Sequence, residues 1–121
     1  MTDNERGEVL SRYLAACESL DPDRISACFS PDAVLVDPEG RAAGRPAIRV
    51  YFERVYSGLS KLTLTTRPIY WCGSLAACEW EGEAIGRDGR TIVYRGIDTF
   101  AIGTGAITQL TAYWDPEILS G

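Results

Sequence analysis

Residues 76–85 alternate between two kinds of side chain, and this pattern constrains the fold more than any other feature. One face of an extended chain here would carry Glu79, Glu81 and Glu83. The other face would carry Cys78, Trp80, Gly82 and Ala84. A strand with one charged face and one uncharged face is typical of an antiparallel sheet that is covered on a single side.

The same period of two continues through the second half of the chain. It predicts strands over residues 62–66, 91–102 and 106–114, and Arg87-Asp88-Gly89-Arg90 has the Asp-Gly signal of a hairpin turn. A shorter apolar run, residues 33–36, predicts one more strand before the turn Asp37-Pro38-Glu39-Gly40. We therefore expect a meander of about four long strands.

Helical spacing dominates the first half of the chain. Apolar side chains recur on one helical face over residues 5–20, with Thr2, Asp3 or Asn4 as the candidate N-cap. Asp21 and Pro22 predict the start of a short second helix that ends near Phe29, followed by a turn at residues 30–32. A third helix is predicted to open at residues 44–46 and to run to about residue 59.

This order predicts an α+β fold formed by a single domain, residues 1–121. Three N-terminal helices would wrap a curved antiparallel sheet and form a cone with an apolar pocket. Such a pocket is where a small ligand would bind.

The chain contains no histidine, which excludes a Ser-His-Asp triad, a Cys-His pair and metal sites built on imidazole. Proton transfer must then use carboxyl, phenol, thiol or amine groups. A net charge of −5 without a basic run argues against binding to nucleic acid or to anionic membranes. No signal peptide or membrane-spanning run is present, so we expect a cytoplasmic protein with four reduced, structural cysteines.

Three polar residues occupy positions where the pattern calls for apolar ones. Tyr13 lies on the inward stripe of the first helix, Asp37 ends an apolar strand, and Asp98 shares its strand face with Tyr94 and Phe100. Each has a structural alternative: a core aromatic, a turn-forming aspartate and an ion-pair partner, respectively. Arg95 is three residues from Asp98, so in a regular strand it would point the opposite way.

Together, two inward carboxyl groups and a phenol would provide a base and two donors for a developing oxyanion. One carboxyl group must be held protonated for this, and burial favours the neutral form of an aspartic acid. Two carboxyl groups with different environments are typical of paired acid and base roles.

The sequence resembles the bacterial Δ5-3-ketosteroid isomerases of the nuclear-transport-factor-2-like (SnoaL-like) superfamily. The matching segments are residues 11–14, 36–40, 44–45, 96–100 and 112–114. The resemblance implies that Asp37 is the general base and that Tyr13 and a protonated Asp98 form the oxyanion hole. It further implies a homodimer that uses neither a metal nor a cofactor and acts on an apolar polycyclic substrate.

The candidate pocket walls are Phe52, Trp80, Phe100, Ala112 and Trp114. Phe29 and Phe52 occupy positions where some isomerases carry tyrosines that support the oxyanion phenol. Two alternatives stay open: another cone-fold enzyme, such as a polyketide cyclase or an epoxide-opening enzyme, and a non-catalytic module that binds small ligands.

Overall fold

The computed structural model describes residues 2–114, which begin with two helices whose ends match the sequence signals. Helix α1 spans Asp3–Ser19, and the Thr2 side chain caps it through a capping box with Glu5. Helix α2 spans Pro22–Ser26 and is capped by Asp21, as expected, but it ends three residues before Phe29.

Strand β1 corrects the predicted turn at residues 30–32. It spans Phe29–Asp37 and so includes Pro31, which the prediction placed outside any strand. Its pairing with the last strand is irregular between Phe29 and Val34, and proline is tolerated in a strand where the ladder is interrupted. A tight turn then leads to strand β2, Gly40–Ala43, which the sequence analysis missed.

Helix α3 spans Arg45–Tyr56, somewhat shorter than predicted. Gly44 precedes it with φ of 89°, a backbone conformation that glycine adopts without strain. The Arg45 guanidinium donates to the carbonyl oxygen of Phe29 through Nε (3.1 Å) and Nη2 (2.8 Å). The Gly44-Arg45 pair therefore ties the start of α3 to the start of β1.

The remaining strands confirm the predicted meander. They are β3, Leu59–Thr66; β4, Tyr70–Cys72; β5, Leu75–Gly86; β6, Thr91–Ile102; and β7, Ile107–Trp114. The short β4 was not predicted. Gly89, with φ of 83°, forms the turn between β5 and β6 as its Asp-Gly signal indicated.

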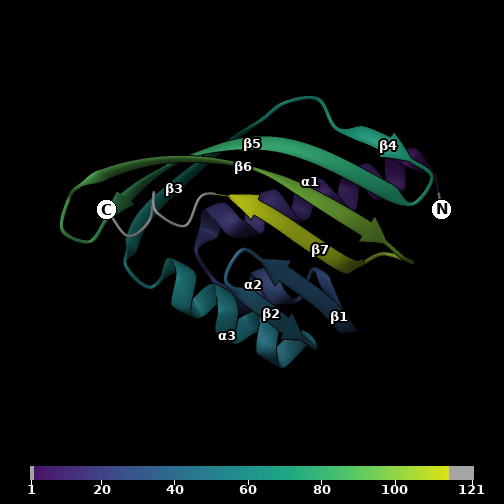
Figure 1. The fold of residues 1–121 in the computed structure, drawn as a ribbon, viewed down its shortest axis with the longest axis horizontal. Helices are drawn as coiled ribbons and strands as arrows, with labels where there is room; N and C mark the ends of the chain where they lie inside the picture. Colours follow the sequence, from purple (N-terminus) through teal and green to yellow (C-terminus); the bar gives the residue numbers. More distant parts are fainter. Residues whose placement is uncertain (1, 115–121) are drawn as a thin grey trace.

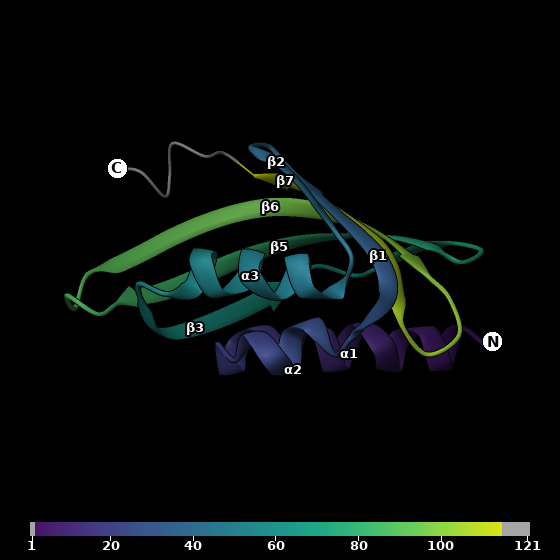
Figure 2. The ribbon, with the colours of Figure 1, turned by 90° about the horizontal axis from the view of Figure 1, so that it is seen from below.

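The strands form one curved sheet in the order β2-β1-β7-β6-β5-β3, with β4 paired to β5 (Figure 1). Among residues 2–114, all strand pairs are antiparallel, as expected, except β1 with β7, which is parallel. The helices lie together on one side of the sheet, as Figure 2 shows. This arrangement is the expected α+β cone.

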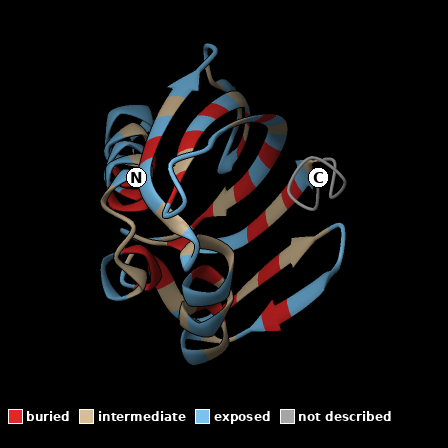
Figure 3. Ribbon diagram, turned by 90° about the vertical axis from the view of Figure 1, so that its left-hand side faces the viewer, coloured by how far each residue is buried: buried red, intermediate tan, exposed pale blue. Residues whose placement is uncertain are grey.

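Buried and exposed residues alternate along the strands (Figure 3). The three glutamates of β5 are exposed, whereas Cys78, Gly82 and Ala84 are buried, which confirms the pattern at residues 76–85. The core fills the space between this buried face and the helices, and Phe29, Ile25 and Ile107 are fully enclosed in it. Within residues 2–114, no helix is both long enough and apolar enough to cross a membrane.

Candidate functional site

A small cavity of about 60 Å³ lies inside the cone, between the buried face of the sheet and helices α1 and α3. Its walls are almost entirely aromatic or aliphatic, with a single carboxyl group. The lining residues are Tyr13, Leu35, Tyr51, Phe52, Val55, Tyr56, Trp80, Tyr94, Asp98, Leu110, Ala112 and Trp114. We call this space the central cavity.

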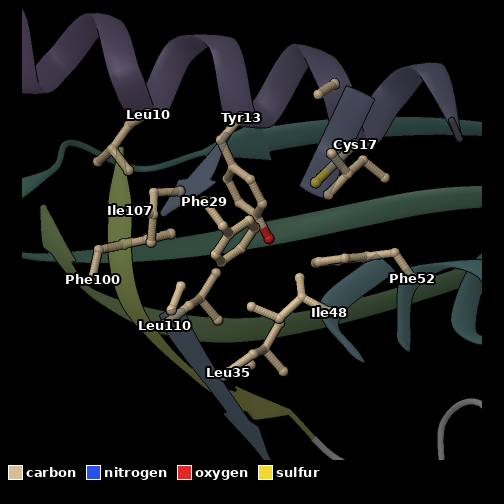
Figure 4. Close-up of a cluster of buried hydrophobic side chains, with 14 of the residues drawn as sticks. Leu10, Tyr13, Cys17, Phe29, Leu35, Ile48, Phe52, Phe100, Ile107 and Leu110 are labelled. Carbon is tan, nitrogen blue, oxygen red and sulfur yellow. The ribbon is translucent and has the colours of Figure 1, made fainter. Parts of the chain in front are cut away.

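Tyr13 enters the central cavity from α1, and its side chain is 5% exposed (Figure 4). Its ring makes edge contacts with Phe29 and Phe100, each at 5.7 Å between ring centroids. Cys17 follows one helical turn later in α1, and its thiol is a neighbour of the Tyr13 hydroxyl. Burial, and then the neighbouring Cys17 and Asp98, raise the pKa of Tyr13 well above its ordinary value, so the phenol stays protonated.

Asp98 enters the same cavity from β6 and is 8% exposed. Burial raises the pKa of Asp98 from 3.8 to about 7, and the nearby indole of Trp80 lowers it in part. Asp98 Oδ1 is buried and has no hydrogen-bond partner among residues 2–114. The structure thus brings the two predicted oxyanion donors to one cavity, where burial favours the protonated form of Asp98.

Two glycines leave room for aromatic rings against the sheet beside Asp98. Gly96 is paired with Trp80 across β5 and β6, and a Cβ at Gly96 would lie only 2.6 Å from the indole Cζ2. A Cβ at Gly82 would lie 3.1 Å from the ring of Tyr94. The two rings meet edge to face, 5.3 Å between centroids, and form the wall of the cavity opposite α1.

Asp37, the predicted base, does not line the central cavity. It lies at the end of β1, where Oδ1 accepts hydrogen bonds from the backbone N–H groups of Glu39 (2.9 Å) and Gly40 (2.8 Å). This is the turn-forming alternative that the sequence left open. Tyr51 lines both the central cavity and an outer groove that contains Asp37, and its phenol lies beside this carboxylate.

Four of the five predicted wall residues line the central cavity: Phe52, Trp80, Ala112 and Trp114. Phe100 does not; it packs against the edge of Tyr13 and borders a groove beneath β4 instead. The sequence analysis missed three phenols of the cavity, Tyr51, Tyr56 and Tyr94. Tyr51 and Tyr56 had the helical spacing of buried residues and Tyr94 shares strand parity with Asp98, but no motif singled them out.

Arg95 points away from the cavity, as its parity predicted. Its side chain is 75% exposed and lies 3.7 Å from Glu81 on the outer face of the sheet. The Asp-Arg-Asp arrangement of an epoxide-opening enzyme is therefore not formed around Asp98.

The curved sheet, the three helices and the enclosed acid define an α+β cone of the nuclear-transport-factor-2-like class. The model of the SnoaL-like domain family matches residues 10–110. The chain therefore belongs to the SnoaL-like domain family.

Solved structures agree with this fold. A putative isomerase from Bacillus subtilis superposes with a TM-score of 0.83 at 19% identity, covering 98% of this chain and 92% of the other. A protein of ketosteroid-isomerase-like fold from Catenulispora acidiphila, in complex with trimethylamine, gives 0.82 at 17% identity and covers 93% and 88%. TerC, co-crystallised with polyporic acid, gives 0.82 at 19% identity and covers 97% and 99%. A search of curated proteins found no match.

Proposed function

We propose that this protein is a cofactor-independent isomerase of the ketosteroid-isomerase type. It would move a proton within a β,γ-unsaturated ketone to give the conjugated enone. The observation that carries the proposal is the meeting of Tyr13 and Asp98 in one enclosed apolar cavity. A phenol and a protonated carboxylic acid are both suited to donate hydrogen bonds to an enolate oxygen in such surroundings.

In the proposed reaction, the Asp37 carboxylate removes the proton from the carbon between the carbonyl group and the double bond. The electron pair of that C–H bond moves onto the carbonyl oxygen and gives a dienolate. Tyr13 and protonated Asp98 donate hydrogen bonds to this oxygen. Protonated Asp37 then returns the proton two carbons further along, so that no atom is gained or lost.

Asp37 would act from the rim of the cavity. Its Oδ1 is held by two backbone N–H groups, which leaves Oδ2 for proton transfer. Tyr51 lies beside the carboxylate and also lines the cavity, so a substrate that reaches Asp37 from the cavity would have to displace this ring. Hydrogen bonds to Oδ1 would at the same time hold the carboxylate in a fixed orientation.

The volume of the cavity limits the size of the substrate that can bind. About 60 Å³ is well below the roughly 300–1,000 Å³ of most ligand pockets. Even one six-membered ring needs on the order of 150 Å³, so any ring requires rim side chains such as Tyr51 and Trp114 to move. A four-ring steroid requires the largest displacement, and the geometry therefore favours a small ketone over the steroid that the resemblance implies. Two of the similar structures were solved with trimethylamine and with polyporic acid, which supports a small-molecule ligand.

The direct test is the growth of enone absorbance with two substrates, cyclohex-3-enone and a Δ5-3-ketosteroid. Asp37→Asn should reduce turnover by a factor of about 10²–10⁴ and Tyr13→Phe by about 10²–10³. Glu8→Gln, on the exposed side of α1, is the control and should leave turnover unchanged. Wild-type protein that conjugates neither substrate would refute the proposal.

A second function is favoured by the position of the two acids, because only Asp98 lies inside the cavity. With its pKa near 7, Asp98 is itself suited to act as the acid and base of another cone-fold reaction, such as a polyketide-type cyclisation. The two functions predict different effects of the same two substitutions. Loss of activity in Asp98→Asn with full activity in Asp37→Asn would support the function in which Asp98 is the acid and base. Loss of activity in Asp37→Asn would support the isomerase function.

We further propose that the protein is a cytoplasmic homodimer that pairs through the outer face of the sheet. This face carries large exposed apolar side chains: Leu75 (54%), Val93 (47%), Ile97 (47%) and Tyr113 (59%). Ile97 and Tyr113 are cross-strand partners, so these two apolar side chains lie side by side where a second copy would cover them. Sedimentation should give a dimeric mass for the wild type and a monomeric mass for Ile97→Lys; a monomeric wild type would refute the proposal.

A further inference from the structure

The indole N–H of Trp80 is an unused hydrogen-bond donor beside Asp98. Its Nε1 atom is buried and has no partner among residues 2–114, and the same holds for Asp98 Oδ1. Both residues line the central cavity. Buried polar atoms without partners are costly, so an orphan donor and an orphan acceptor in one cavity require an explanation.

The backbone places the indole ring in this position. Trp80 is paired with Gly96 in the β5–β6 ladder, and Asp98 lies two residues beyond Gly96 on the same buried face. Any side chain at Gly96 would collide with the indole, because even a Cβ would lie 2.6 Å from Cζ2. The glycine therefore leaves room for the ring over β6. The indole N–H lowers the pKa of Asp98 as a hydrogen-bond donor does, but the pair does not reach full hydrogen-bond geometry, so Nε1 has no partner.

We propose that Trp80 is a ligand-binding residue whose indole N–H donates a hydrogen bond to the oxygen atom of a small phenol, enol or ketone held beside Asp98. The site then has three donors, on Tyr13, Trp80 and protonated Asp98. Unlike the other two, the indole donor cannot ionise at accessible pH. Trp80 was predicted from the sequence only as an apolar wall, whereas the structure gives it a polar role.

This inference rests on the proposed function only in placing the ligand in the central cavity, and it can be tested without turnover. The probes are phenol and toluene, which have nearly the same shape and differ in one hydroxyl group. Binding is followed by NMR of the indole N–H groups in protein labelled with nitrogen-15. The resonances are assigned with the variants Trp71→Phe and Trp80→Phe.

Phenol should shift the Trp80 N–H resonance strongly, and toluene should shift it little. Trp80→Phe should weaken phenol binding relative to toluene binding by about fivefold to tenfold, the usual effect of losing one hydrogen bond. Trp80→Phe also removes apolar contacts, because phenylalanine is smaller than tryptophan. This loss affects phenol and toluene alike and therefore does not change the ratio of the two affinities. Trp71→Phe is the matched control, because Trp71 borders the groove beneath β4 and not the cavity, and it should leave the ratio unchanged.

Two results would overturn the inference. One is that phenol binds, and binds more weakly in Tyr13→Phe, while the Trp80 resonance and the affinity ratio in Trp80→Phe do not change; the cavity would then remain the site without this donor. The other is that neither probe binds. Failure of the proposed isomerisation alone, with an intact Trp80 response to phenol, would leave the inference standing.

Discussion

The raised pKa of Asp98 predicts a specific dependence of stability on pH. Burial moves its pKa from 3.8 to about 7 in the folded protein. The folded state holds the Asp98 proton more tightly than the unfolded state, so protonation of Asp98 raises the free energy of unfolding. This stabilisation is complete below about pH 4 and is lost as the pH rises through 7. At about 1.4 kcal/mol per pKa unit, the full loss is about 4 kcal/mol, of which about 2–3 kcal/mol falls between pH 5 and pH 8.

The perturbation that isolates this effect is Asp98→Asn, which keeps the size of the side chain and removes its ionisation. Urea denaturation of wild type and variant at several values between pH 5 and pH 8 gives the difference in free energy of unfolding at each pH. This difference should shift in favour of the variant by about 2–3 kcal/mol as the pH rises. Its absolute value at pH 5 is less informative, because the amide also changes local hydrogen bonding.

Glu8→Gln provides the control, because it neutralises an exposed carboxyl group of α1 and should leave the pH dependence nearly unchanged. If the difference between wild type and Asp98→Asn stays constant within about 0.5 kcal/mol across this range, Asp98 is already ionised in the folded protein at pH 5. In that case the oxyanion-donor role proposed for it fails as well.

Two further perturbations test other parts of the structure. Gly96→Ala should lower the free energy of unfolding by about 1–3 kcal/mol, because the new Cβ would lie 2.6 Å from an indole ring and 2.7 Å from a backbone carbonyl oxygen. Gly82→Ala, with its nearest contact at 3.1 Å, should cost less, and equal costs in urea denaturation would contradict this packing. In a timed reaction with a thiol reagent, exposed Cys72 should react first. Buried Cys17, whose pKa is raised to about 12, should react only as the protein unfolds, so early modification of it would show that the core is open.

Much of the fold could be read from the sequence because each long element buries one face. The alternation at residues 76–85 fixed which side of β5 faces the helices, and the Asp-Gly turn fixed its hairpin with β6. Local caps fixed the starts of α1 and α2. Elements whose pairing partner is distant in the chain were harder to predict, and β1 shows why. Pro31 signals a turn locally, but β1 pairs with β7 at Phe29 and again from Val34, on both sides of the proline.

The sequence by itself determined that Tyr13 and Asp98 face inward, because helical and strand periodicity assign a residue to a face. It could not decide whether Asp37 shares their cavity, since that depends on how the end of β1, its turn and Tyr51 pack together. Only the tertiary structure places the indole of Trp80 over Gly96, next to Asp98 across two strands. Periodicity assigns a side chain to one side of a sheet, whereas a site forms where side chains from separate elements meet at atomic distances, and that is decided by packing.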